Sequence, residues 1–282
     1  MLIMNLTEKL VIRVGKKLPV IVLPEGENPI ITKAARRAEQ DGICKPILLK
    51  GDDALVRAAK MLADGNADGM VAGIDHTTRD VILTTRDYVG MTEGNKTFSS
   101  LFVMEFPDSR VLVLSDGGVT KNPSAEQLTD IISLTHQASL PILPDKPRVA
   151  MLSFSTIGSG GRDDSITKIQ ESINLVRERQ PNIIIDGEFQ LDTAVNREIG
   201  AKKAPDSKVA GRANILITPD LNSGNILYKS LEQFASAHAY GPVLLGFAKP
   251  VSDLSRGSTV DDVYGCLAII AAQIMESKEN KK

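Results

Sequence analysis

Residues 148–186 read RVAMLSFSTIGSGGRDDSITKIQESINLVRERQPNIIID. The apolar run at 148–153 predicts a short buried strand, and the run at 182–186 predicts a second one. Between them lies a loop rich in glycine and hydroxyl groups, followed by apolar residues at helical spacing over 165–179. A strand, a helix and a second strand in this order are typical of two strands that pair in parallel. This stretch therefore predicts an α/β fold.

The same alternation extends along the rest of the chain. Further strands are expected at 20–23, 46–49, 69–72, 111–115 and 215–218, and further helices at 29–40, 124–138, 224–237 and 260–278. Ser124 is expected to cap one helix, and Asp164 or Ser165 the helix at 165–179. The proline-rich segment 140–146 and the polar segment 200–212 are expected to be loops. Short apolar strands that alternate with helices indicate a largely parallel sheet.

Composition excludes several classes of protein. The 282 residues include 33 basic and 35 acidic side chains, for a formal net charge of -2. A surface that neutralises many phosphates of nucleic acid needs a basic excess, so we expect no nucleic-acid partner. Aromatic residues make up 4% of the chain and tryptophan is absent, which disfavours surfaces that stack on bases.

The sequence also predicts where the protein resides. Its two cysteines, Cys44 and Cys266, are too few for a cysteine-rich zinc site or a disulfide framework and indicate a reducing compartment. Charged residues interrupt residues 1–17, which therefore lack the continuous apolar core of a signal peptide. The longest apolar run, 267–272, is far shorter than the ~20 residues that cross a bilayer. We expect a cytoplasmic protein with no membrane association.

Polar side chains gather in loops next to expected strands, where α/β sheets commonly bind ligands. Ser155 and Thr156 belong to a loop that could present N–H and O–H donors to an anion, or form a flexible turn. Asp220 and Asn222 could form an Asx turn and cap the next helix. His76, beside a strand end, is more often a structural group than a base. The four loops are GIDHTTRD (73–80), SFSTIGSGG (153–161), TPDLNSGN (218–225) and KPVSDLSRGSTVDD (249–262).

The last of these loops has the densest chemistry. Ser255, Arg256 and Asp262 supply a hydroxyl, a fixed cation and a carboxylate within one loop and the start of a helix. Capping by Ser258 or Thr259, together with the helix dipole, would explain the acidic residues of the first turn. Capping leaves the Ser-Arg-Gly sequence unexplained.

Six blocks carry a family resemblance that covers most of the chain. They are LPEGENPIITKAARRAEQDGICKPILL, ADGMVAGIDHTT, RVAMLSFSTIGS, IIIDGEFQLDTAV, KAPDSKVAGRANILITPDLNSGNILYK and YGPVLLGFAKPVSDLSRGSTVDDV. With these blocks in the family's order, the chain resembles the phosphate acetyltransferase and phosphate butyryltransferase family. The resemblance implies acyl transfer between coenzyme A and inorganic phosphate, with acetyl-CoA and acetyl phosphate as the first choice. Coenzyme A is then a substrate, and no bound cofactor or metal is implied.

The resemblance also implies roles for individual residues. Asp262 would remove the proton of the CoA thiol, which is mostly protonated at neutral pH. Arg256 would bind the phosphoryl oxygens, Ser255 would donate to the carbonyl oxygen as charge develops there, and Tyr240 would line the acyl phosphate pocket. The remaining substrate-binding candidates are Gly257, His76, Thr77, Thr78, Arg79, Arg86, Ser155, Thr156 and Asn222.

Relatives of this kind have two α/β domains of the isocitrate/isopropylmalate dehydrogenase type, form dimers and bind substrate in the cleft between the domains. The resemblance therefore implies a homodimer, with one domain of residues 1–92 plus 242–282 and an inserted domain of residues 93–241.

Two departures from the family pattern bear on function. Only residues 50–66 lie between the strands at 46–49 and 69–72, where the family has several dozen more, so at least one helical piece is expected to be missing. A family arginine that contacts phosphate corresponds to Leu83 here. Arg79 and Arg86 would share a helix face with Leu83, so either could replace the lost guanidinium or be a solvated surface residue.

Several alternatives remain open from the sequence. A relative that binds CoA or an acyl phosphate without catalysis is favoured by Leu83 and the short segment. The alternative that the protein is a nucleotide-linked dehydrogenase rests on fold analogy alone. It is disfavoured because no expected strand is followed by G-x-G-x-x-G. Cys44 and Cys266 look like small core residues rather than nucleophiles. The preference for an acetyl or a butyryl group could depend on a single side chain in the acyl pocket.

Overall fold

The segment 148–186 folds as a strand, a helix and a strand. In the computed structural model, which describes residues 4–15 and 17–279, these are β6 (Val149–Leu152), α6 (Asp164–Arg179) and β7 (Ile185–Phe189). β6 and β7 pair in parallel, as predicted. The second strand starts three residues later than expected because a turn follows α6, where the N–H of Ile183 donates to the carbonyl of Gln180.

The chain forms two compact units, Met1–Asn95 with Ala239–Lys282, and Lys96–His238. In the first unit the strands lie in the order β2-β1-β3-β10-β9, and all are parallel except β9, which runs antiparallel to β10. These strands are β1 (Val20–Leu23), β2 (Lys45–Leu48), β3 (Gly69–Ala72), β9 (His238–Leu245) and β10 (Val251–Asp253). The helices are α1 (Leu6–Val14), α2 (Pro29–Gln40), α3 (Ala54–Ala63), α4 (Thr78–Tyr88) and α10 (Val260–Glu279).

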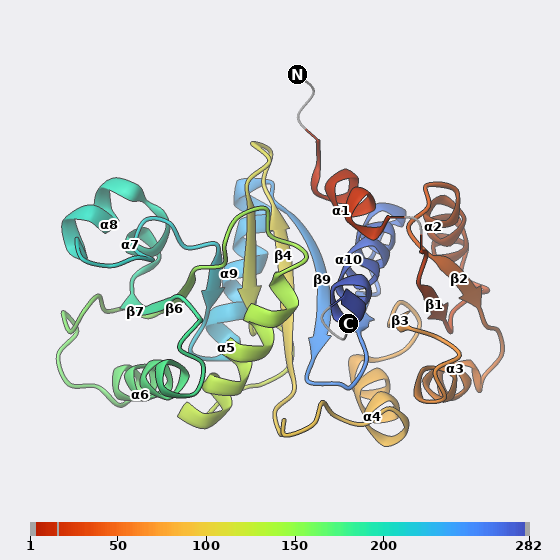
Figure 1. Cartoon of the computed structure of the whole chain (residues 1–282), viewed down its shortest axis with the longest axis horizontal. Helices are drawn as coiled ribbons and strands as arrows, with labels where there is room; N and C mark the ends of the chain where they lie inside the picture. The colour runs from red at the N-terminus through yellow and green to blue at the C-terminus, as the bar shows by residue number, and fades with distance from the viewer. Residues whose placement is uncertain (1–3, 16, 280–282) are drawn as a thin grey trace. The chain divides into compact units, whose positions relative to one another are not determined.

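In the second unit the strand order is β4-β5-β8-β6-β7, and only the β4–β5 pair is antiparallel. The additional strands are β4 (Ser99–Glu105), β5 (Val111–Ser115) and β8 (Ile215–Ile217). Helix α5 packs on α6, and α7 packs on α8 (Figure 1). The bounds of these helices are Ala125–Ser139 for α5, Leu191–Val195 for α7, Arg197–Lys203 for α8 and Leu221–Ala235 for α9. The predicted α/β class and parallel pairing are therefore confirmed.

The most apolar segment of the chain is the middle of α10. Leu267 to Ala272 are all buried, and the helix packs on α1, α2 and β3. A helix that is apolar on every side is expected in a core. In the described part of the chain, no helix combines the length and the apolarity that a membrane crossing requires.

Some expected boundaries were wrong, and each has a local cause. Asp163, rather than Asp164 or Ser165, caps α6, because its side chain accepts the N–H of Ser165. Helix α9 starts at Leu221 instead of residue 224, since Asp220 is its cap. The segment 200–212 is partly helical, because α8 includes its first residues. Ser124 caps α5 as predicted, and Gln127 completes a capping box with it.

Candidate active site

Three neighbouring parallel strands, β1, β3 and β10, end at the same edge of the first unit's sheet. Each is followed by a loop that carries polar groups. Glu25 follows β1, residues 73–77 follow β3, and residues 254–259 follow β10. The structure thus brings together two of the four loops selected from the sequence, 73–80 and 249–262, and adds Glu25, which sequence reasoning missed.

Glu25 is the anchor of this edge. Its side chain is 1% exposed. It accepts hydrogen bonds from the backbone N–H groups of residues 73–76, and His76 Nδ1 lies 2.7 Å from its Oε1 atom. A buried carboxylate is costly unless donors surround it, and here four amides and one imidazole do so. The signal that could have found it is an acidic residue directly after a buried strand.

His76 is held in one orientation by this carboxylate. Its side chain is 27% exposed, and its Nδ1 atom faces Glu25. A bond at one ring nitrogen decides which nitrogen faces a ligand. Nε2 is therefore the ring atom available to substrate, as no other described side chain bonds to His76.

The two threonines that follow have different tasks. Thr77 caps α4: its hydroxyl accepts the N–H of Asp80 and donates to Asp80 Oδ2. Thr78 donates to Asp253 Oδ2 at 2.5 Å, which ties the start of α4 to the end of β10. Asp253 is buried, and its Oδ1 atom has no hydrogen-bond partner among the residues that the structure describes. Burial, and next the nearby charge of Glu25, raise the pKa of Asp253 to about 6, although the bond from Thr78 opposes the rise.

The Ser-Arg-Gly sequence lies exposed in the loop after β10. Ser255 Oγ accepts the N–H of Gly257 at 3.3 Å, and the carbonyl of Ser255 accepts the N–H of Ser258. The guanidinium of Arg256 forms no hydrogen bond or ion pair with the residues that the structure describes. It is an uncompensated positive charge at this edge.

Asp262 belongs to a reciprocal cap at the start of α10. Its Oδ2 atom accepts the N–H of Thr259 at 2.7 Å and the hydroxyl of Thr259 at 2.8 Å, while Thr259 Oγ1 accepts the N–H of Asp262 at 3.3 Å. Its neighbour Asp261 pairs with Arg37 at 2.6 Å. Capping by Thr259, one of the two candidates, therefore accounts for the position of Asp262. It does not account for Arg256.

Tyr240 is buried against the same helix. A Cβ atom on Gly265 would lie 2.1 Å from Tyr240 Cδ1, so the ring can pack here only because residue 265 is glycine. Gly265 lies one helical turn after Asp262 on α10. The ring of Tyr240 thus packs against the first turns of α10 at Gly265.

Comparisons with known proteins identify the family. The model of the family described as "Phosphate acetyl/butaryl transferase" matches residues 50–272. The chain belongs to this family. The phosphate acetyltransferase of Acetivibrio thermocellus is 33% identical, and the match covers 96% of this chain and 98% of that protein. A phosphotransacetylase from Streptococcus pyogenes superimposes with a TM-score of 0.90 at 31% identity, over 98% of this chain and 100% of that one.

Two expectations from the resemblance are addressed by these matches. A 4-hydroxythreonine-4-phosphate dehydrogenase from Klebsiella pneumoniae shares the fold alone, with a TM-score of 0.56 at 12% identity over 92% of this chain and 99% of that one. The predicted likeness to a dehydrogenase fold is thus confirmed. The alignment with the Acetivibrio enzyme runs over 327 positions although this chain has 282 residues, so that family member carries segments that this chain lacks. Residues 50–66 nevertheless form a helix, α3.

The three residues that the resemblance relates to phosphate binding lie on α4. Leu83, Arg79 and Arg86 all belong to this helix, whose buried side consists of Val81 and Thr85. Arg86 is paired with Asp87 at 2.7 Å. Arg79 is exposed and makes no hydrogen bond or ion pair with the described residues. The structure therefore leaves Arg79 freer than Arg86 to bind an anion.

The loop at 153–161 does not present its donors outward. Ser155 and Thr156 are buried, and the hydroxyl of Ser155 donates to Glu188 Oε1 at 2.8 Å. The N–H of Gly158 donates to the same oxygen, and the N–H of Gly160 donates to Ser155. The other amides from 155 to 161 are also bonded within the unit. Residues 157–160 form a turn, and the internal carboxylate of Glu188 takes up donors that the sequence had suggested for an external anion.

The loop at 218–225 is largely structural. Asp220 caps α9 by accepting the N–H of Ser223, as the capping interpretation predicted. Gly224 packs against the carbonyl of Asp116, where a Cβ atom would lie 2.0 Å from the oxygen. The amide of Asn225 donates to the carbonyl of Gly117. Asn222 is exposed in the first turn of α9.

The cysteines are core residues, as predicted. Cys44 and Cys266 are fully buried. Burial raises the pKa of Cys44 to about 12 and that of Cys266 to about 11. Both thiols stay protonated at neutral pH, so neither acts as a nucleophile.

Asp253 should make stability depend on pH in a specific direction. Its carboxyl ionises near pH 4 in the unfolded chain and near pH 6 in the fold, so the free energy of unfolding falls as the pH rises through this window. Asp253→Asn cannot ionise. Its stability relative to the wild type is expected to rise by about 2 kcal/mol between pH 4 and pH 7.

Urea unfolding at pH steps from 4 to 7 measures this difference. Asp52→Asn, at an exposed position, is the matched control, and its difference from the wild type should vary by less than about 0.5 kcal/mol over the same range. A constant difference for Asp253→Asn across the range contradicts the assignment.

Proposed function

We propose that this protein transfers an acetyl group between coenzyme A and inorganic phosphate, so that acetyl-CoA and phosphate interconvert with acetyl phosphate and CoA. The observation that carries the proposal is the exposed, unpaired guanidinium of Arg256 beside the loop that holds His76 and Thr78, in a chain of this acyltransferase family. The family resemblance supports the reaction, and the exposure of Arg256 supports its assignment to the anion.

The phosphoryl group is bound by Arg256. A guanidinium offers two parallel N–H donors to two phosphate oxygens and stays charged at all relevant pH values. Gly257, which lacks a side chain, lets the backbone approach the phosphate closely. His76 faces the substrate through Nε2, because Glu25 holds Nδ1. The hydroxyls of Thr77 and Thr78 hold the shape of this loop through Asp80 and Asp253.

The acyl carbonyl is polarised by Ser255. Its Oγ atom accepts the N–H of Gly257, which leaves the hydroxyl proton free to donate. A donor aimed at the carbonyl oxygen stabilises the negative charge that develops there when a nucleophile attacks. Tyr240, packed on Gly265, supports the acyl pocket from the side of α10.

The thiol of CoA loses its proton to Asp262. Thr259 donates two hydrogen bonds to Asp262 Oδ2 and so fixes the carboxylate at the start of α10. The sulfur forms a bond to the carbonyl carbon, the bond between that carbon and the phosphate oxygen breaks, and phosphate leaves. The proton taken from sulfur passes from Asp262 to the departing phosphate, so the cycle consumes no other reactant.

Asn222, which is exposed, is assigned to substrate contact. Ser155 and Thr156 act as positioning residues, since their hydroxyls are used within the unit. They maintain the shape of the loop rather than touch substrate.

A non-catalytic relative is the second candidate. It is favoured by Leu83, which stands where the family has a phosphate-binding arginine, and by the short connection at 50–66. Such a protein would bind CoA or an acyl phosphate without acyl transfer. The same assay separates the two functions.

Formation of the thioester from CoA and acetyl, propionyl or butyryl phosphate tests the proposal. Asp262→Asn is expected to lower kcat at least 100-fold, because the base is removed. Arg256→Ala is expected to raise the KM for acetyl phosphate at least tenfold and also lower kcat. Arg57→Ala, which removes an exposed guanidinium bonded near the start of α3, is the matched control and should keep full activity.

A wild-type protein that forms no thioester from any of the three acyl phosphates, but still binds CoA, overturns the enzyme and establishes the binding relative. Equal rates for Asp262→Asn and the wild type would remove Asp262 from the mechanism. The ratio of rates among the three acyl phosphates names the acyl chain.

Arg79 is proposed to replace the guanidinium lost at Leu83. It is unpaired, whereas Arg86 is engaged with Asp87. Arg79→Ala is expected to raise the KM for phosphate about 10- to 100-fold, and Arg86→Ala less than threefold. Steady-state kinetics in the direction of acetyl phosphate formation measure both. Unchanged phosphate affinity in Arg79→Ala rejects this role.

A homodimer is the proposed assembly. On α9 only Gly224 is buried, while Ile226 is 66% exposed and Phe234 is 90% exposed. These two apolar side chains lie eight residues apart and so on one side of the helix. We assign a second copy of the chain as the partner that covers them, because a dimer is what the family resemblance implies.

Phe234→Asp tests this assembly, because a buried unpaired charge would oppose association. Sedimentation analysis is expected to give twice 30.4 kDa for the wild type and 30.4 kDa for the variant. Gln233→Asp, at the next exposed position, should remain a dimer. A monomeric wild type, or a dimeric Phe234→Asp variant, refutes the proposed interface.

A further inference from the structure

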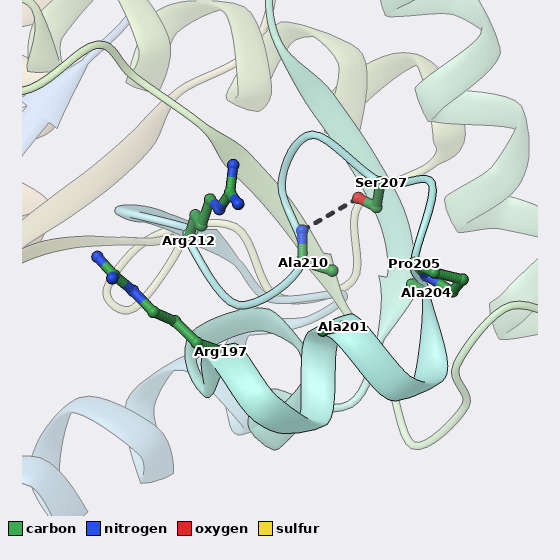
Figure 2. A pocket seen from close by; sticks show the side chains of 7 residues that line it. All are labelled: Arg197, Ala201, Ala204, Pro205, Ser207, Ala210 and Arg212. Atoms are coloured by element: carbon green, nitrogen blue, oxygen red, sulfur yellow. Dashed lines mark hydrogen bonds between the residues drawn. The ribbon is translucent and has the colours of Figure 1, made fainter.

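A cavity of about 390 Å³ lies within the second unit, between α8 and the loop that follows it (Figure 2). This volume is at the lower end of the range for sites that bind small organic molecules, and larger than a bare inorganic ion needs. None of its residues belongs to the candidate active site. It is lined by Arg197, Ala201, Ala204, Pro205, Ser207, Ala210 and Arg212.

The walls of the cavity are held together by close backbone packing. A Cβ atom on Gly200 would lie 2.5 Å from the N atom of Gly211, so α8 and the loop can approach only because both residues are glycine. The loop is closed by Ser207, whose Oγ atom accepts the N–H groups of Val209 and Ala210. The N–H of Gly211 donates to the carbonyl of Thr193. The cavity is therefore preformed.

The charged side chains that line the cavity are both basic, Arg197 and Arg212. The whole chain, by contrast, has a formal net charge of -2. Arg197 and Arg212 are exposed, and no hydrogen bond or ion pair joins either guanidinium to the described residues. Two unpaired guanidiniums at one cavity are arranged for an anion, since each offers a planar fork of donors.

The cavity is also divided by polarity. Figure 2 shows the two arginine side chains at one end and Ala204 with Pro205 at the other. The hydroxyl of Ser207, which accepts two amides, keeps its proton free to donate. A ligand that fits this cavity has a negatively charged head that binds the arginines. Its body is compact and partly apolar, and it carries a hydrogen-bond acceptor for the hydroxyl of Ser207.

We propose that this cavity binds a small organic dianion, with a phosphate monoester or dicarboxylate head held by Arg197 and Arg212 and a short apolar body against Ala201, Ala204 and Pro205. Two positive charges match two negative ones, and the methyl groups exclude water from the body of the ligand. The site is independent of acyl transfer, as neither Arg256 nor Asp262 takes part in it.

Calorimetric titration of the full-length protein tests the site, with phenyl phosphate and succinate as the two organic probes and inorganic phosphate for comparison. Arg197→Gln and Arg212→Gln are each expected to weaken binding of the preferred probe about 10- to 100-fold, and the double variant to abolish it. Both positions are exposed, so the substitutions leave the core intact. Lys202→Gln, which removes a charge from the same helix outside the cavity, should change the affinity less than threefold.

A second variant separates the body of the ligand from its head. Ala201→Leu fills the apolar part of the cavity and leaves both guanidiniums in place. It is expected to weaken phenyl phosphate or succinate at least tenfold and to leave the affinity for inorganic phosphate unchanged. The probe that binds with the higher affinity shows whether the charged head of the ligand is a phosphate ester or a dicarboxylate.

Arg256→Ala distinguishes this site from the candidate active site. Binding that survives Arg256→Ala and is lost in the Arg197/Arg212 double variant establishes the cavity as a separate site, whatever the outcome of the thioester assay. Saturable binding that the double variant retains, or the absence of saturable binding for both organic probes, overturns the proposal.

Discussion

The buried carboxylate of Glu25 is the constraint on which the first unit's candidate site depends. Four backbone amides of residues 73–76 and one ring nitrogen of His76 donate to it. A charge removed from water in this way is stable only while its donors remain in place, so the carboxylate forces the loop after β3 into one shape. That shape sets the orientation of His76 and the start of α4, and through Thr78 it reaches Asp253 at the end of β10.

The second unit uses the same device. Glu188 in β7 accepts from Ser155, from Gly158 and from Gln170, and it shapes the loop after the neighbouring strand β6. Although burial by itself raises it, these hydrogen bonds hold the pKa of Glu188 below its ordinary value. In each unit, a glutamate lies at or just beyond the end of one parallel strand. It accepts the hydrogen bonds that a glycine- or hydroxyl-rich loop after the neighbouring strand would otherwise donate to an anionic ligand. A loop with many donors is therefore evidence of an anion, but the anion can be part of the protein.

The sequence was most informative where the determinants are local. Helix α2 begins and ends at the predicted residues because Asn28 caps it and its apolar residues repeat at helical spacing. The strands β9 and β10 and the residue Glu25 were missed, and each has partners far away in the chain. Glu25 bonds to residues about fifty positions later, and Thr78 bonds to a residue 175 positions later. Ser255 and Arg256 could be selected because their motif is contiguous, and because capping left them unexplained.

Four carboxylates of the two units and three arginines at the two proposed anion sites differ in how fully the described residues satisfy them. Glu25, Glu188, Asp261 and Asp262 all accept bonds from the protein. By contrast, Arg256 in one unit and Arg197 with Arg212 in the other make none with the described residues. A guanidinium without a carboxylate partner is stable at an exposed position. It binds most strongly to an oxyanion whose two oxygens accept two parallel N–H hydrogen bonds. In a chain whose formal charge is slightly negative, these guanidiniums without a partner among the described residues are the groups on which both proposed anion sites rest.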